Sequence, residues 1–263
     1  MRFIIFSLAR CGSTTLMNAL NCYPDVRCAL EPFTPANLGT PYGHITEAAA
    51  LDKALTELWR DYNGIKHVWH PAGWPFKGAA ELNRRLLWHE NAQIIFLDRR
   101  NSLQRVISTE ISWQTSVWGR YTEEQRQRVR RFDFKPVSLV KIERQLGEMA
   151  AGLDEMRSTL HAAAVNYFEL WYEDLFGGDV YLAERLKLMD RLRAFVGAAP
   201  VGDVRIDFAV ANVLNPETSK LNLIETYRRI PNIDEVERRF GSDEAGWLFK
   251  ESSDHALLSG GGI

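Results

Sequence analysis

Short apolar runs of strand length alternate along the chain with longer segments in which apolar residues recur at helical spacing. The strand-like runs are Phe3–Ser7, Arg27–Leu30, Ile65–Trp69, Gln93–Leu97 and Val165–Leu170. The helix-like segments are Thr14–Asn21, Ala48–Tyr62, Ala79–His89, Ser102–Gln114 and Leu139–Ala163. This alternation predicts an α/β fold of three layers, in which helices flank a central, mainly parallel sheet. Ligands of such sheets bind at the carboxyl ends of the strands, so we expect the functional residues directly after them.

The composition is that of a globular protein long enough to bury a full core. The 263 residues are 46% hydrophobic and 25% charged, and we expect a single domain over residues 1–263 with a frayed tail at about 256–263. The formal net charge of -2 gives no general attraction to nucleic acid or to an anionic membrane. We therefore expect no nucleic-acid partner, and any anion site must be local.

Apolar runs and cysteines suggest a compartment. No run approaches the roughly 18 apolar residues of a membrane span, and the apolar start MRFIIF is too short for a signal peptide. We expect a cytoplasmic protein without a membrane span. The three cysteines, Cys11, Cys22 and Cys28, lack metal-ligand spacing and favour free thiols, with a Cys22–Cys28 disulfide as the open alternative.

The stretch SLARCGSTTL, residues 7–16, joins the first predicted strand to the first predicted helix. Small residues, the hydroxyls of Ser13, Thr14 and Thr15, and the amides of a helix N-terminus can together surround a phosphate. Arg10 adds a forked, permanently charged donor. An ATP-binding loop would carry Gly-Lys, whereas Gly12 is followed here by Ser13. The alternative is a plain turn in which Ser13 or Thr14 caps the helix.

A second basic cluster follows the fourth predicted strand, in the stretch AQIIFLDRRNSLQRVIS. Asn101 or Ser102 can cap the next helix, and Ser108 falls two turns into that helix. An arginine at the strand end and a hydroxyl on the helix can clamp a second phosphate. The alternative is that Arg99 and Arg100 are surface residues at a strand end.

These two stretches together resemble the paired signatures of sulfotransferases that use 3′-phosphoadenosine 5′-phosphosulfate (PAPS). In that family the first loop holds the 5′-phosphosulfate, and an Arg with a Ser eight residues on holds the 3′-phosphate; Arg100 and Ser108 have that spacing. A third element, WYEDLF at residues 171–176, is similar to the family's Tyr-Glu-Asp-Leu, whose tyrosine lies near the nucleotide and matches Tyr172. The resemblance covers residues 2–176, is nearest to bacterial and carbohydrate-type members, and implies a P-loop-like fold.

The resemblance also implies roles at the first loop. PAPS would be the co-substrate, bound by residues 10–15, which are Arg10, Cys11, Gly12, Ser13, Thr14 and Thr15. Arg10 is the candidate for the charge on the bridging oxygen. Lys66 resembles a lysine that family members direct at the sulfuryl group. We expect no metal requirement, because a sulfuryl group carries less charge than a phosphoryl group and the chain shows no metal-ligand spacing.

The general base has more than one candidate. Glu31, in the pair Glu31-Pro32, is similar to the acidic residue proposed as base in carbohydrate-type relatives, and it is the favoured candidate. Animal enzymes use a histidine on the next strand, but the gap-free match from Lys66 places Val68 there, flanked by His67 and His70. Of these two, His70 is preferred because it lies at the strand end.

The acceptor is the least defined part of the sequence. The aromatic residues Trp69, Trp74, Phe76, Trp113 and Trp118 suit sugar rings, phenols or acyl chains alike, so the acceptor is a small molecule, a glycan or a lipid, and a homo-oligomer is left open. The arginine-rich segment 120–135 could approach an anionic ligand or form a solvated helix face. A P-loop kinase or NTPase with Asp98 as its magnesium ligand, and a noncatalytic nucleotide-binding protein, are the alternative functions.

Overall fold

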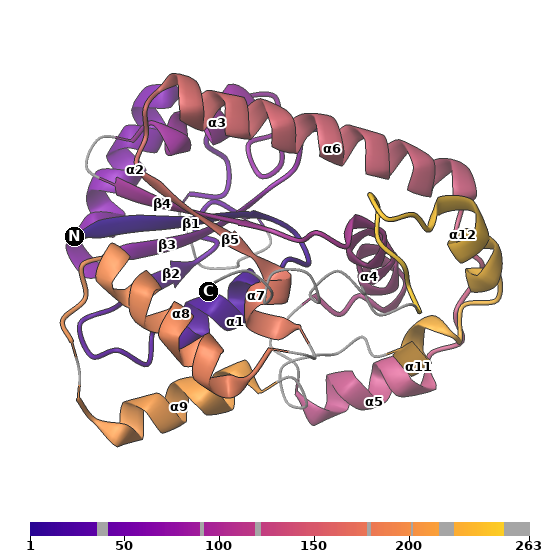
Figure 1. Ribbon diagram of the computed structural model, residues 1–263. Helices are drawn as coiled ribbons and strands as arrows, with labels where there is room; N and C mark the ends of the chain where they lie inside the picture. The colour runs from indigo at the N-terminus through magenta and orange to yellow at the C-terminus, as the bar shows by residue number, and fades with distance from the viewer. Residues whose placement is uncertain are drawn as a thin grey trace, which may run out of the picture. The chain divides into compact units, whose positions relative to one another are not determined.

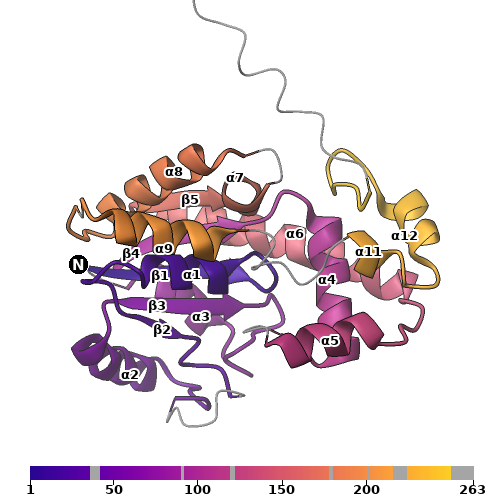
Figure 2. The same ribbon diagram turned by 90° about the horizontal axis from the view of Figure 1, so that it is seen from below.

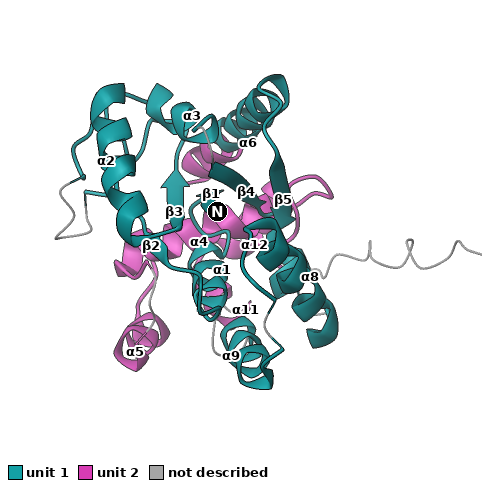
Figure 3. Ribbon diagram, turned by 90° about the vertical axis from the view of Figure 1, so that its left-hand side faces the viewer, with its two compact units in different colours: residues 1–99, 147–220 teal, residues 100–146, 221–263 magenta. Residues whose placement is uncertain are grey.

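The computed structural model describes residues 1–35, 42–89, 92–118, 122–177, 180–200, 202–215 and 224–249. The chain divides into two compact units, coloured separately in Figure 3: residues 1–99 with 147–220, and residues 100–146 with 221–263. Each unit has its own cluster of buried apolar side chains. The tail predicted at about 256–263 lies outside the described residues. The single domain stays a prediction.

A five-stranded, wholly parallel sheet forms the centre of the first unit, with the strand order β2-β3-β1-β4-β5 (Figure 1). The strands are β1 Arg2–Leu8, β2 Cys28–Leu30, β3 Gly64–Trp69, β4 Ala92–Asp98 and β5 Tyr167–Trp171. All five lie where the apolar runs predicted them, which confirms the α/β fold class. Only β5 starts late, because the amide of Val165 donates to the carbonyl of Leu160 and still belongs to the end of a helix.

The strand β1 lies between β3 and β4, and its carboxyl end is therefore enclosed by theirs. Ile4 aligns with Ile65 on one side and with Ile94 on the other, and this three-strand centre is buried. From β1 the chain crosses to β2 beyond β3, whereas from β4 it crosses to β5 on the opposite side. The carboxyl ends of β1 and β4 consequently flank the switch point at which sheets of this kind bind their ligands.

Helices cover both faces of the sheet, as the three-layer prediction required (Figures 1 and 3). On one face lie α3, Glu81–Leu87, and the part of α6, Leu139–Ala162, that belongs to the first unit. On the other lie α1, α8 and α9, with α9 packed along α1 (Figure 2). The remaining bounds are α1 Ser13–Leu20, α2 Ala48–Asp61, α7 Tyr172–Phe176, α8 Leu182–Phe195 and α9 Val204–Leu214. The sequence had not predicted α7, α8 and α9.

The described part of the second unit is helical. It contains the start of α6 together with α4 Ser102–Thr115, α5 Glu123–Arg131, α11 Ile224–Tyr227 and α12 Ile233–Phe240. The side chain of Asn101 accepts from the amide of Gln104 and caps α4, as the sequence allowed. Residues 123–131 of the arginine-rich segment form α5, on which Val129 is the buried residue, so the solvated helix face is the better interpretation for them; residues 120 and 121 lie outside the described part of the chain.

Within the described residues, no helix is both long and apolar enough to cross a membrane. Cys11, Cys22 and Cys28 are free thiols, so the Cys22–Cys28 disulfide left open by the sequence is not formed.

Candidate functional site

The loop between β1 and α1 has the backbone geometry of an anion cradle. Arg10 and Gly12 adopt left-handed conformations, with φ of 67° and 81°. Alternation of left- and right-handed residues turns successive amides to one side and forms a concave site for an anion. The first bond within α1 runs from the amide of Leu16 to the carbonyl of Gly12, over 3.0 Å. The amides of residues 13–15 precede that bond, lack acceptors inside the helix and stand at its positive end.

The predicted residues of this loop contribute different groups. The N-cap of α1 is Gly12, which has no side chain to cap with, so the interpretation of Ser13 or Thr14 as a capping residue is wrong. Cys11 is fully buried, so only its backbone can face a ligand. Ser13 is also buried, while Thr14 and Thr15 are half-buried.

Gly12 brings the third sequence motif against the loop. A Cβ at Gly12 would lie 2.6 Å from Cε2 of Phe176 and 3.0 Å from Cδ2 of Tyr172, both in α7. Real Cβ atoms do not approach so closely, so glycine is required here for packing as well as for its positive φ. The loop of residues 10–15 and the segment 171–176, which the sequence joined by resemblance alone, are thus neighbours in the fold.

Arg99 lies in the same cluster. Its guanidinium carbon stands 4.3 Å from the centre of the Tyr172 ring, and its Nη1 donates to the carbonyl of Arg10 over 3.4 Å. The alternative interpretation of the sequence made Arg99 a surface residue at a strand end, but the side chain is buried. That interpretation is wrong for Arg99 because Tyr172, more than 70 residues later in the sequence, covers it. Arg100, the next residue, is exposed.

Lys66 of β3 joins the loop to Glu31. Its Nζ donates to Oγ1 of Thr14 over 2.8 Å and forms a short ion pair with Oε1 of Glu31. The backbone aligns the two residues, since the amide of Glu31 donates to the carbonyl of Lys66 over 3.0 Å. Burial lowers the pKa of Lys66, and the charge of Glu31 opposes that shift. The Lys66 ammonium is buried, whereas the Glu31 carboxylate is partly exposed.

The two histidines of this region lie apart from that cluster. His67 is buried among the rings of Phe6, Phe33 and Phe76 and shares a 2.8 Å hydrogen bond with Oδ1 of Asn83. Successive strand residues face opposite sides of a sheet, so the His67 side chain lies on the face opposite to Lys66. Burial lowers the pKa of His67 to about 4. His70 lies beyond the end of β3, where its Nδ1 accepts from the amide of Ala72 over 2.9 Å.

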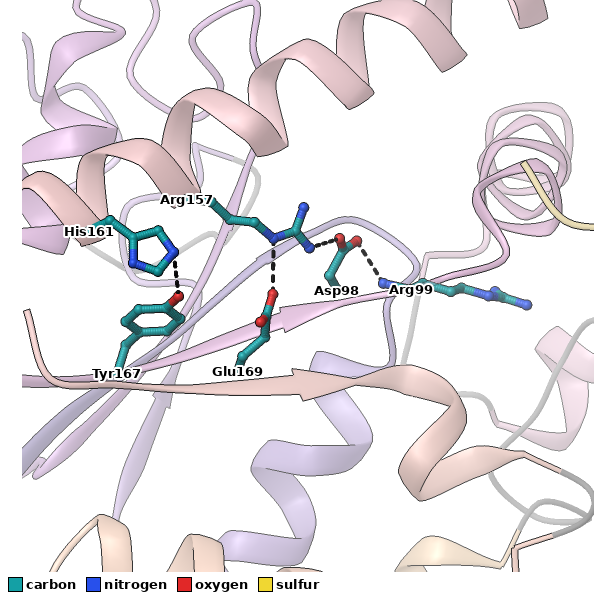
Figure 4. A network of polar contacts seen from close by, with 6 residues as sticks. All are labelled: Asp98, Arg99, Arg157, His161, Tyr167 and Glu169. Carbon is teal, nitrogen blue, oxygen red and sulfur yellow. Dashed lines mark hydrogen bonds and ion pairs between the residues drawn. The ribbon is translucent and has the colours of Figure 1, made fainter. Parts of the chain in front are cut away.

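Asp98 at the end of β4 is held by two donors (Figure 4). Arg157 of α6 donates from Nη2 to Oδ2 of Asp98 over 2.6 Å, and the amide of Arg99 donates to Oδ1 over 2.6 Å. Arg157 also donates from Nε to Glu169 over 2.9 Å. The sequence missed Arg157 because no local pattern marks it: its partner Asp98 is 59 residues away. The kinase alternative needed Asp98 as a magnesium ligand, and these donors occupy both of its oxygens.

Arg100 and Ser108 belong to the second unit, because the boundary between the units falls after Arg99. Ser108 is buried in α4 and Arg100 is exposed just before that helix. Their position relative to the loop of residues 10–15 stays a prediction from motif spacing.

Most aromatic residues considered for the acceptor have a place in the fold. Trp69 and Phe76 are buried in the core of the first unit, and Trp74 is half-buried. Trp113 and Trp118 are exposed in the second unit and meet edge to face, with ring centres 4.8 Å apart.

In the described part of the chain, no group of three His, Cys, Asp or Glu side chains could hold a metal ion.

Comparison with known proteins yields one distant likeness to report. No family model matches the sequence, and no curated protein matches it. Among solved structures, the mouse sulfotransferase SULT7A1 complexed with PAP is similar at a TM-score of 0.43 and 14% identity, over 86% of this chain and 68% of the mouse chain. A likeness this distant does not assign a function, which has to be argued from the residues of this chain.

Proposed function

We propose that the protein is a sulfotransferase that moves a sulfuryl group from PAPS to a hydroxyl or amine of a small molecule, a glycan or a lipid, and releases 3′,5′-ADP. The cluster of Lys66, Thr14 and Glu31 carries the proposal. It joins a buried cation, a hydroxyl of the anion loop and a partly exposed carboxylate through two contacts of Lys66. Group transfer to a hydroxyl needs these three: charge stabilisation, a held donor and a base.

The donor would be held by groups with separate tasks. The amides of residues 11–15, the hydroxyls of Thr14 and Thr15 and the guanidinium of Arg10 would bind the 5′-phosphosulfate. By their motif spacing, Arg100 and Ser108 are assigned to the 3′-phosphate, and Tyr172 to the neighbourhood of the nucleotide. The left-handed backbone at Arg10 and Gly12 supports the assignment of the loop, as does the first bond of α1, which leaves the amides of residues 13–15 without an acceptor inside the helix.

The transfer itself is an in-line displacement in which the S–O bond to the acceptor forms as the bond to the bridging phosphate oxygen breaks. Negative charge develops on that bridging oxygen, where Lys66 and Arg10 would stabilise it. Glu31 would accept the proton that the acceptor hydroxyl loses. Cationic side chains and amides supply the charge that this step needs, so the proposal includes no metal.

Glu31 remains the preferred base over the two histidines. His67 is disfavoured because it is buried on the other face of β3 and its lowered pKa of about 4 makes it a weak proton acceptor. His70 is the second candidate, and its Nδ1 already accepts a backbone hydrogen bond. The ion pair with Lys66 orients the Glu31 side chain beside the loop.

The competing functions are supported less well. A kinase or NTPase would need Gly-Lys in the loop and a strand-end carboxylate free for magnesium, and Asp98 is engaged by Arg157 and by the amide of Arg99. A noncatalytic nucleotide-binding protein would need no base beside the loop, whereas Glu31 is held there with part of its carboxylate exposed. The proposal includes a cytoplasmic location and allows for a homo-oligomer.

Thermal shift tests the proposed donor directly. We expect 3′,5′-ADP to stabilise the protein, by about 2.7 kcal/mol at a hundred times its Kd, and ATP with magnesium to have no comparable effect. Stabilisation by ATP with magnesium and none by 3′,5′-ADP would overturn the sulfotransferase proposal.

Two glycine variants test whether the thermal shift with 3′,5′-ADP depends on the loop of residues 10–15. Gly12→Ala places a Cβ against Phe176 and should abolish the shift with 3′,5′-ADP. Gly78→Ala is the matched control, because Gly78 has the same φ of +81° but open space around its missing Cβ. If both variants lose the thermal shift with 3′,5′-ADP equally, the loss comes from backbone strain and not from a change in the loop.

A further inference from the structure

A line of polar contacts runs from α6 across the carboxyl end of β4 to the anion loop. Arg157 donates to Asp98, Asp98 accepts from the amide of Arg99, and the side chain of Arg99 donates to the carbonyl of Arg10. Figure 4 shows the first two contacts, with Arg157 reaching from α6 and Arg99 extending away from the strand. All four residues belong to the first unit. No motif in the sequence connected α6 with the loop.

The α6 end of this line is rigidly held. The guanidinium of Arg157 lies over the rings of Trp171 and Phe96, 5.1 and 5.4 Å from their centres, and pairs with two carboxylates. Asp98 is buried, and both of its oxygens accept a hydrogen bond. The direction in which the chain leaves β4 is therefore fixed at Asp98, and with it the starting point of the Arg99 side chain.

The loop end of the line meets the most unusual backbone of the site. Arg10 has a φ of 67°, a conformation that residues with a Cβ seldom adopt and that persists only where the surroundings impose it. Its carbonyl accepts from Arg99, whose guanidinium is itself fixed over the ring of Tyr172. Tyr172 in turn borders Gly12, the other left-handed residue of the loop. Arg99 thus contacts the turn directly at Arg10 and indirectly, through Tyr172, at Gly12.

We propose that Arg99 is a positioning residue of the donor site: set in place by the Arg157–Asp98 ion pair, it holds the Arg10–Gly12 turn in the form that binds the anionic donor. The proposal rests on the proposed function for the identity of that donor. Arg99 acts through the carbonyl of Arg10 and the ring of Tyr172, and it exchanges no atom with the substrate. Lysine cannot replace it, because a point charge lacks the planar face and the fork that make both contacts.

Hydrogen exchange of the free protein tests the positioning without any ligand. Exchange of the amides at residues 9–15 should rise at least about tenfold in Arg99→Lys and in Asp98→Asn, if holding the turn is worth about one ordinary hydrogen bond. Glu169→Gln is the matched control, since it removes the other partner of Arg157 and leaves the Asp98 contact in place. A merely structural role would raise exchange equally in β4 and α6.

Calorimetric titration with 3′,5′-ADP tests the link to the donor. The Kd should rise about tenfold in Arg99→Lys and in Asp98→Asn, and by less than about twofold in Glu169→Gln. If Asp98→Asn fails to fold, Arg99→Lys decides, because it leaves the Arg157–Asp98 ion pair intact.

The outcomes separate this inference from the proposed function. Unchanged exchange at residues 9–15 in Arg99→Lys overturns the positioning role, and faster exchange with an unchanged Kd overturns its connection to the donor. A wild-type protein that does not bind 3′,5′-ADP counts against the proposed function, whereas the exchange experiment still decides whether Arg99 holds the turn.

Discussion

Two ion pairs of the first unit have opposite partners facing solvent. In the pair on β3, the Lys66 side chain is 3% exposed and the Glu31 side chain 24%. In the pair on β4, the Asp98 side chain is 4% exposed and the Arg157 side chain 23%. Both pairs join a buried side chain to a partly exposed one, but only in the first pair does the partly exposed side chain carry the carboxylate.

The exposed partner decides what each pair can do. A carboxylate that meets solvent can take a proton from an acceptor, while a buried carboxylate that accepts two hydrogen bonds can only fix its neighbours. The charge of a buried ammonium next to an anion loop is screened less by water, so it acts more strongly on a ligand. On the proposed function, the first pair would serve the chemistry and the second would support the structure around it.

The largest expected effect comes from Glu31→Gln. It keeps the shape of the side chain and removes the proton acceptor, so kcat for sulfuryl transfer should fall about 10²- to 10⁴-fold. Binding of 3′,5′-ADP, measured by calorimetry, should be retained. If turnover persists, the base must be a histidine, and the same loss in His70→Gln would identify it.

Lys66→Met should follow, with kcat lower by about 10²- to 10³-fold, because the developing charge on the bridging oxygen loses its buried cation. Steady-state kinetics at saturating donor would measure the effect. Lys53→Met, which removes an exposed lysine of α2, is the control and should leave kcat unchanged. An equal kcat in wild type and Lys66→Met would show that the buried cation of the Lys66–Glu31 pair does not contribute to turnover.

Arg157→Leu should act mainly on stability. It removes the Arg157 cation that pairs with the buried Asp98, and the free energy of unfolding should fall by about 3 kcal/mol in urea titrations. Arg84 and Glu155 form an exposed ion pair on the same side of the first unit, and Arg84→Leu should cost about 0–1 kcal/mol. Similar losses in both variants would show that burial does not set the strength of the Asp98 pair.

The smallest effect is the pH dependence contributed by His67, the residue after Lys66 on the opposite face. Its pKa is lowered to about 4 in the folded protein and is near the ordinary value of 6.5 when unfolded, so the unfolded state binds the proton first as the pH falls. Stability is complete above the unfolded pKa and should be lower by about 2 kcal/mol near pH 5.

Urea titrations near pH 5 and above the unfolded pKa, on wild type and on His67→Gln, measure this contribution. The variant should lose the extra acid sensitivity, while His70→Gln should keep it. If the free energy of unfolding depends on pH in the same way in wild type and in His67→Gln, the acid sensitivity belongs to other groups.

The sequence predicted the parts of the molecule that depend on local pattern. Apolar runs marked all five strands, and the motifs marked both the loop at Arg10 and Gly12 and the segment that begins at Tyr172, which the fold brings together. It could not predict the roles of Arg99, Asp98 and Arg157, because each depends on a partner distant in the sequence. The helices after residue 177 were missed since α8 and α9 lack a clear alternation with strands and match no motif.

The central position of β1 has a consequence for how the chain comes to be folded. Its neighbours are β3 and β4, so Phe3 to Phe6, all fully buried in the finished sheet, are synthesised before both of their partner strands. The second edge of β1 is closed only when Ala92–Asp98 has been made, roughly 5 to 20 s later at ordinary rates of synthesis. During that interval the apolar side chains of β1 are exposed and can bind a chaperone, and the turn at Arg10 lacks its contact with Arg99.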